Sequence, residues 1–360
     1  LYSELETKYQ EALIRESEKI EEVQIIKPAL FPVAPINPPV VLPKIFIGSI
    51  MGLIIGLIIA FILENMDTSI GAIEDMERFL GTPVLGIIPQ INHSEMKSKY
   101  FSDPKIMHKR EYKEMLMLLT HYAPKSPISE SYKTIRTNVS FMIKHEKKKV
   151  FLVSSSSSGE GKTMIAINLA ISMAQMGFKT LLIDSDLRKP MVHNAFKISR
   201  DPGFSDVILG NKDFNEAINN VINLLMHDFT FEEIMMTPGL DNLDILTAGT
   251  RVDNPSEVLN SPRLDDIINE MKKNYDFILF DTPPILPVTD AAMIGHRTDG
   301  VFMVFKAGTV ARKAIGRAKL LFHSLKVDIK GLVMNGVKIE TSSDKDFLKL
   351  QTYYYNPTKK

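Results

Sequence analysis

Two kinds of hydrophobic pattern divide the chain: one long apolar run, and later a series of short apolar runs separated by helical stretches. Residues 45–63 (IFIGSIMGLIIGLIIAFIL) carry no charge over 19 positions. As a helix, this run would be about 28 Å long, which nearly matches the hydrocarbon core of a bilayer. The alternative is a buried core helix, but globular helices are rarely apolar on all sides over this length. The pattern therefore predicts a transmembrane helix over residues 45–63.

The short apolar runs all lie between residues 127 and 340. They are residues 150–153 (VFLV), 181–183 (LLI), 243–246 (LDIL), 277–280 (FILF), 301–305 (VFMVF) and 332–334 (LVM). Continuous apolar runs of this length are typical of parallel strands that are buried on both faces of a sheet. The pattern predicts an α/β fold with a mostly parallel sheet, helices on both of its faces, and a transmembrane helix before it.

The same reading divides the chain into five segments. Residues 1–44 are expected to hold the end of an extracytoplasmic helix and a proline-rich stretch, because residues 28–43 contain six of the 20 prolines. Residues 45–63 form the span, residues 64–126 a juxtamembrane segment and a polar linker, residues 127–340 the α/β domain, and residues 341–360 a tail. Because the chain begins with leucine, we expect it to be a fragment of a longer protein.

Composition narrows the classes of function. The 43 basic and 43 acidic side chains balance, so net charge gives no reason to expect a nucleic-acid partner. The chain has no cysteine. This excludes cysteine nucleophiles, thiolate zinc sites, cysteine-ligated iron–sulfur clusters and disulfide scaffolds.

The first apolar run leads into a loop that has the composition of a phosphate-binding loop. The loop SSSSSGEG (154–161) is followed by Lys162, Thr163 and a helical stretch. Backbone N–H groups in such a loop, together with the helix N-terminus, attract phosphate oxygens, and a lysine followed by a hydroxyl residue serves the β and γ phosphates and Mg²⁺. The strict pattern has glycine where this chain has Ser156, which leaves a flexible serine linker as the alternative. The expected nucleotide-binding residues of this segment are Ser158, Gly159, Glu160, Gly161, Lys162, Thr163 and Met164.

Three aspartates follow apolar runs. Asp184 and Asp186 end the run 181–183, and Asp281 ends the run 277–280. The carboxyl ends of parallel strands share one edge of the sheet, where ligands bind. The three carboxylates are therefore expected at the edge that carries Lys162, although any one of them alone could be a helix cap.

Together these segments resemble the bacterial tyrosine kinases of the polysaccharide co-polymerase type, over nearly the whole chain. SSSSSGEGKT is similar to the family's Walker A motif, LLIDSDLRKP to its Walker A′ motif and FILFDTPP to its Walker B motif. The resemblance implies a P-loop NTPase-like fold that uses ATP and Mg²⁺. It implies that Lys162 and Thr163 bind phosphate and Mg²⁺, that Asp186 and Asp281 hold Mg²⁺, and that Asp184 accepts the tyrosine proton.

The resemblance implies two further sets of residues. Asn335 stands where related ATPases contact adenine, with a simple strand cap as the alternative. Glu130, Lys133 and Arg136 resemble the family's oligomerisation motif, although lysine replaces the usual middle arginine and cannot offer its planar fork. Their spacing of three puts them on one face of a helix, which would suit a ring-shaped homo-oligomer, or a solvated face.

The tail QTYYYNPTKK contains Tyr353, Tyr354 and Tyr355, which the resemblance implies are autophosphorylation sites; a chance cluster is the alternative. The implied partners are a polysaccharide polymerase, an outer-membrane export machinery, a tyrosine phosphatase and membrane lipid. The implied location is the bacterial inner membrane. Basic residues near the span favour a cytoplasmic N-terminal side, but ATP is cytoplasmic, so we expect the kinase domain there.

Two other functions stay open at this point. Partition or division-site ATPases carry a second lysine five residues before the Walker lysine, and this chain has Ser157 there, which counts against them. A non-catalytic regulator of polysaccharide chain length would share the motifs, and phosphotyrosine on the tail would distinguish it from a kinase.

Overall fold

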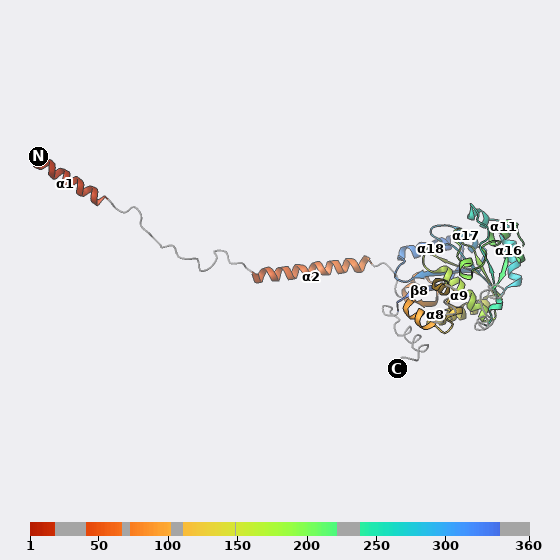
Figure 1. Ribbon diagram of the computed structural model, residues 1–360. Helices are drawn as coiled ribbons and strands as arrows, with labels where there is room; N and C mark the ends of the chain where they lie inside the picture. Colours follow the sequence, from red (N-terminus) through yellow and green to blue (C-terminus); the bar gives the residue numbers. More distant parts are fainter. Residues whose placement is uncertain (19–40, 67–72, 102–110, 148, 222–237, 339–360) are drawn as a thin grey trace, which may run out of the picture. The chain divides into compact units, whose positions relative to one another are not determined.

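The computed structural model describes residues 1–18, 41–66, 73–101, 111–147, 149–221 and 238–338 (Figure 1). The chain divides into two compact units, Leu1–Asp67 and Thr68–Lys360. The predicted tyrosines of the tail lie outside the described residues.

The first unit contains two helices, α1 (Tyr2–Ser17) and α2 (Val41–Met66). Within α2, Val41–Phe61 is long and apolar enough to cross a membrane, and none of it is buried inside the structure. Pro43 does not interrupt α2, because proline is tolerated in the first turn, where its missing N–H has no helical partner. The sequence predicted this span over residues 45–63.

The second unit is built on one eight-stranded sheet. Its strands are β1 (Val84–Pro89), β2 (Val150–Ser155), β3 (Thr180–Asp184), β4 (Ile218–Asn220), β5 (Leu243–Leu246), β6 (Phe277–Asp281), β7 (Gly300–Lys306) and β8 (Ile329–Val337). Their order is β1-β8-β7-β2-β6-β3-β5-β4, and every pair is parallel except β4 with β5. The predicted α/β fold with a mostly parallel sheet is confirmed, and each of the six predicted runs is a strand.

The helices of this unit are α3 (Ile73–Leu80), α4 (His93–Glu95), η1 (Met96–Tyr100), α6 (Tyr112–Met117), α7 (Leu119–Tyr122), α8 (Pro127–Glu146), α9 (Lys162–Gln175), α10 (Val192–Phe196), α11 (Phe204–Leu209), α12 (Phe214–Ala217), η2 (Leu240–Asn242), α15 (Pro255–Leu259), α16 (Arg263–Asn274), α17 (Asp290–Gly295) and α18 (Arg312–Ser324). The longest of these are α8, α9, α16 and α18.

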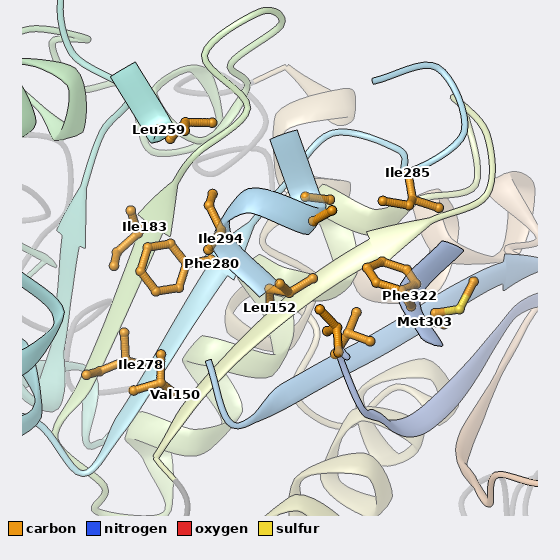
Figure 2. Close-up of a cluster of buried hydrophobic side chains, with 14 of the residues drawn as sticks. Val150, Leu152, Ile183, Leu259, Ile278, Phe280, Ile285, Ile294, Met303 and Phe322 are labelled. Carbon is orange, nitrogen blue, oxygen red and sulfur yellow. The ribbon is translucent and has the colours of Figure 1, made fainter. Parts of the chain in front are cut away.

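Alternate residues of each central strand enter two separate cores, one on each face of the sheet. Val150 and Leu152 of β2 belong to one core, whereas Phe151 and Val153 belong to the other. Figure 2 shows the first core, where strand side chains meet residues of α15, α17 and α18 such as Phe322. The second core contains α8 and α9. Both faces are therefore covered, which explains why the central strands contain continuous apolar runs.

The polar linker expected in the second part of residues 64–126 differs from that expectation where it is described. Met115 of α6, Leu118 between the helices and Leu119 of α7 are fully or almost fully buried. Asn168 of α9 holds this segment, because its Oδ1 accepts from the N–H and the hydroxyl of Thr120 at 2.8 and 3.0 Å. Charged residues and prolines around this short apolar stretch conceal it in the sequence. β1, expected only as part of a short juxtamembrane unit, likewise joins the sheet beside β8.

Candidate active site

The serine run between β2 and α9 is an ordered loop. Ser154 Oγ donates to the carbonyl of Pro283 at 3.0 Å, and Ser155 Oγ donates to the carbonyl of Ser157 at 2.7 Å. Gly161 caps α9 with a φ of +92°, which favours glycine. These contacts exclude the flexible-linker alternative.

Glu160 organises this loop from inside. Its Oε1 accepts from Ser156 Oγ at 2.7 Å, from the Ser157 N–H at 2.5 Å and from Ser157 Oγ at 2.9 Å. Asn335, at the end of β8, donates from Nδ2 to the Glu160 carbonyl at 2.9 Å. The serine that replaces the usual glycine at position 156 thus supplies a hydroxyl that the loop uses.

Lys162 lies between two of the predicted carboxylates. Its Nζ is 3.0 Å from Asp186 Oδ2 and 3.8 Å from Asp281 Oδ1, and the Lys162 side chain is only 14% exposed. Burial by itself lowers the pKa of Lys162, but the charges of Asp281 and Asp186 outweigh it and raise the pKa overall. Lys162 is therefore a firmly charged ammonium at the sheet edge.

Asp184 and Asp281 are partners on adjacent strands, β3 and β6. Asp184 Oδ2 accepts from the N–H groups of Met191 and Val192 at 3.0 Å each. Burial, followed by the charge of Asp281, raises the pKa of Asp184 to about 8. Burial also raises the pKa of Asp281, against the opposing effect of Lys162. The edge therefore holds carboxyls that keep a proton more readily than exposed aspartates do.

Three buried carboxylate oxygens at this edge accept no hydrogen bond within the described residues: Asp184 Oδ1 and both oxygens of Asp281. Oxygens of this kind, with the Thr163 hydroxyl, are ligands that Mg²⁺ prefers. No group of three or more His, Asp or Glu side chains in the described part of the chain is arranged to hold a metal alone. Mg²⁺ usually takes one or two carboxylates together with substrate phosphates and water, so these residues fit it.

A cavity of about 470 Å³ opens beside Lys162. Its polar lining residues are Ser158, Gly159, Gly161, Lys162, Thr163, Asp186, Arg188 and Lys189. Its apolar lining residues are Met117, Met164, Met191, Pro283, Pro284, Pro287 and Val288. Six of the seven predicted loop residues line it, and Glu160 does not, because its carboxylate turns into the loop. A cavity lined by both kinds of residue has partners for a phosphate chain and for an apolar ring.

Several lining residues were not predicted. Arg188 carries a signal in the sequence, since it follows Asp186 by two positions, and Pro283 and Pro284 directly follow the Asp281–Thr282 pair. Met117 and Met191 carry no such signal, because only the fold brings α6 and α10 to the loop.

The predicted oligomerisation residues lie on α8 and make contacts inside their own chain. Lys133 Nζ bonds Glu130 Oε1 and the Pro124 carbonyl. Arg136 Nη1 donates to the Ser172 carbonyl at 3.5 Å, and burial lowers the pKa of this half-buried arginine. A subunit contact through these residues stays a prediction, as does an adenine contact of Asn335.

Comparison with known proteins identifies the family. Residues 147–324 match the model of the family described as "AAA domain". The chain is 36% identical over 221 residues to tyrosine-protein kinase YwqD of Bacillus subtilis, covering 61% of this chain and 86% of that protein. It is 30% identical to a putative tyrosine-protein kinase in the cps region of Klebsiella pneumoniae, covering 94% of this chain but only 44% of the longer relative.

Solved structures agree with this. The kinase domain of the Escherichia coli tyrosine kinase ETK matches with a TM-score of 0.60 and 26% identity, over 72% of this chain and 91% of that one. The nucleotide-binding loop, the sheet and these relatives lead to one conclusion. The chain belongs to the bacterial tyrosine-protein kinase family and carries its kinase domain.

Proposed function

We propose that this protein is a membrane-anchored tyrosine autokinase that transfers the γ-phosphate of ATP, with Mg²⁺, to Tyr353, Tyr354 and Tyr355. One observation carries the proposal. Lys162 lies between Asp186 and Asp281 in a cavity lined by both polar and apolar side chains. The polar lining suits a phosphate chain, and the apolar lining suits a phenol ring.

The residues of the chain divide the chemical work. The loop N–H groups and Lys162 bind the phosphates. An arriving phosphate replaces Asp186 as the ion-pair partner of the Lys162 ammonium. Bound Mg²⁺, held by Thr163, Asp186 and Asp281, would neutralise charge on the phosphates. Asp184 takes the proton of the attacking phenol. A carboxyl whose pKa is near 8 suits that transfer, because general bases work best when their pKa is close to the working pH.

The anchor and the partners belong to the same proposal. Helix α2 would hold the protein in the bacterial inner membrane, with the kinase domain on the cytoplasmic side, where ATP is found. One relative is named for a cps region, which supports a role in the synthesis and export of an extracellular polysaccharide. The polymerase, the outer-membrane export machinery and a tyrosine phosphatase would be its partners.

The main test replaces Lys162 with Met. We expect loss of tail phosphotyrosine on incubation with ATP and Mg²⁺, measured by mass spectrometry, because the variant loses its phosphate-binding cation. Lys212→Met is the matched control, since Lys212 pairs with Glu216 at an exposed site outside the cavity. Unchanged phosphorylation in Lys162→Met would exclude the kinase mechanism, and a parent protein without phosphotyrosine would favour a non-catalytic regulator.

Asp184→Asn tests the base. The variant should still bind ATP but lose about 10²- to 10⁴-fold in transfer rate, the usual contribution of a general base. Loss of ATP binding instead would show that Asp184 serves chiefly the metal and phosphate site.

Assembly has its own test. Glu130→Ala with Arg136→Ala should shift the protein toward monomer in analytical ultracentrifugation, and added salt should act in the same direction on surface charges. Equal sedimentation of variant and parent at matched concentration would contradict the proposed contact.

Transfer between subunits is the last part of the proposal. Tyr353 lies 18 residues after Asn335, at most about 60 Å of extended chain, so both its own site and a neighbour's are within reach. We expect a Lys162→Met protein with an intact tail to be phosphorylated by an active protein that lacks residues 353–355. Absence of phosphate on the inactive partner, while the active one modifies a tyrosine peptide, would contradict transfer in trans.

A further inference from the structure

An arginine at the active-site cavity is held by a completely buried carboxylate. Arg188, which lines the cavity, donates from Nε to Asp290 Oδ2 at 2.7 Å and from Nη2 to Asp290 Oδ1 at 3.2 Å. Asp290 has no exposed surface. A two-pronged contact of this kind fixes the plane of the guanidinium as well as its position.

Ser256 completes the arrangement. Its hydroxyl donates to Asp290 Oδ1 at 2.8 Å and accepts from Arg188 Nη2 at 2.9 Å. Arg188 follows β3, Asp290 begins α17 and Ser256 lies in the first turn of α15, so three separate segments hold one guanidinium. Nη1 of Arg188 makes no hydrogen bond within the described residues, and its two N–H groups are left for a ligand.

The net charge of the site indicates that phosphoryl transfer needs a further cation there. With Asp184 protonated, Lys162 and a bound Mg²⁺ would exceed the charge of the carboxylates Asp186 and Asp281 by only one. The phosphates bring further negative charge, which spreads over the γ-phosphoryl oxygens during transfer. Position 157, which carries a second lysine in partition-type ATPases, is serine here. A further cation must therefore come from elsewhere.

Of the remaining cations that line the cavity, Arg188 is the one with a fixed side chain. Lys189 also lines it, but within the described part of the chain only its backbone N–H makes a hydrogen bond, to Asp186 Oδ1. A cation that is already in position costs no reorganisation when charge develops, and this favours rate over ground-state binding. Arg188 and the metal-binding carboxylate Asp186 both line this cavity.

We propose that Arg188 is a catalytic residue whose Nη1 contacts the transferring phosphoryl group, and that Asp290 and Ser256 are positioning residues that hold it there. The proposal rests on the proposed function. In the step itself, the tyrosine oxygen forms a bond to the γ-phosphorus, the bond from that phosphorus to the β–γ bridging oxygen breaks, ADP leaves with the electron pair, and Asp184 receives the phenol proton. Arg188 forms no covalent bond and stabilises the charge on the non-bridging oxygens.

The test uses the full chain in detergent and measures single-turnover transfer, ADP formation and the affinity for a fluorescent ATP analogue. Arg188→Lys keeps the charge but loses the fork, and should slow transfer about 10²-fold, the usual effect of removing one preorganised donor, with less than a threefold change in affinity. Asp290→Asn, which loosens the guanidinium, should slow transfer by a smaller factor. In combination with Arg188→Lys it should add little, because Asp290 acts through Arg188.

Two further variants keep the result interpretable. Arg188→Met alone would strand a buried carboxylate, so Arg188→Met is combined with Asp290→Asn; this pair should fold, as thermal melting will show, and be at least as slow as Arg188→Lys. Arg297→Lys is the matched control. Arg297 pairs with Asp265 at 2.9 Å outside the cavity, and its replacement should leave the rate within twofold.

Two results would overturn the proposal. One is an Arg188→Lys variant that transfers as fast as Arg297→Lys, and the other is a loss that lies entirely in nucleotide affinity while the transfer rate is unchanged. Measuring ADP formation distinguishes a failure of the Arg188 proposal from a failure of the proposed kinase function. A parent protein that makes ADP but no phosphotyrosine contradicts the kinase proposal, whereas Arg188→Lys must still slow its ADP formation, because hydrolysis develops the same phosphoryl charge.

Discussion

Glu160 provides the sharpest test of how the phosphate loop is ordered. Its side chain is 2% exposed and does not line the cavity, yet three donors of Ser156 and Ser157 converge on its Oε1. Glu160→Ala removes this acceptor and leaves the backbone unchanged. We therefore expect the loop of the variant to lose its fixed conformation and to bind nucleotide more weakly.

The magnitude follows from the contacts. Three hydrogen bonds at a net value of about 0.5–1.5 kcal/mol each give about 1.5–4.5 kcal/mol. Glu160 Oε2 is buried and has no hydrogen-bond partner among the described residues, so removing that oxygen returns part of this amount. In the variant, ordering the loop therefore costs about 1–3 kcal/mol of the free energy of nucleotide binding. This corresponds to a loss of about 5- to 150-fold in affinity.

The assay is calorimetric titration of a non-hydrolysable ATP analogue with Mg²⁺, together with thermal melting. Glu160→Gln keeps one carbonyl oxygen for the serines and should lose less affinity than Glu160→Ala. Glu216→Ala is the matched control, because Glu216 is exposed and pairs only with Lys212 among the described residues. An alanine variant that binds within twofold of the parent would refute the reasoning, and normal affinity with a lower melting temperature would reduce Glu160 to a structural role.

Three further predictions concern other parts of the kinase domain. Gly161→Ala should weaken nucleotide binding, because its Cβ would lie 2.2 Å from Asn335 Nδ2 and must displace that amide from the Glu160 carbonyl, at a φ of +92°. Gly177→Ala, at +89° with no atom within 4 Å, should cost only the backbone strain of about 1–3 kcal/mol; equal titration and melting curves for the two would contradict this. Asn168→Ala removes the hydrogen bonds to Thr120 and Met117. It should lower the free energy of unfolding by about 2–4 kcal/mol in urea titrations and speed hydrogen exchange over residues 112–122. Unchanged exchange in that segment would disprove the anchoring role of Asn168. In EDTA, Asp184 of the folded protein keeps its proton up to a pKa of about 8, whereas the same group in the unfolded chain loses it above about pH 4. Asp184 therefore makes the free energy of unfolding fall as the pH rises from 4 to 8, and Asp184→Asn should flatten this pH dependence. Equal slopes for variant and parent would count against the raised pKa.

The sequence alone determined the elements whose signal is local. Residues 150–153 and 277–280 are continuous apolar runs because their strands are buried on both faces, and Asp184 and Asp281 end their strands at one edge because the sheet is parallel. From those facts follow the fold class, the position of the phosphate loop and the convergence of carboxylates on Lys162. The long apolar run likewise predicted α2, since length and lack of charge are properties of the sequence itself.

Only the tertiary structure decided the contacts between segments that are distant in the chain. Asp290 carries no local sign that it holds Arg188, because the two are 102 positions apart and meet through the folding of α17 against the site. Residues 112–122 looked like part of a linker until the amide of Asn168 and the second core gave their apolar side chains a place to pack. The sequence placed Glu160 in the phosphate loop, and only the fold shows that its side chain supports the loop from inside. In each case, the free energy depends on which partner the fold supplies, and a residue's neighbours in sequence do not contain that information.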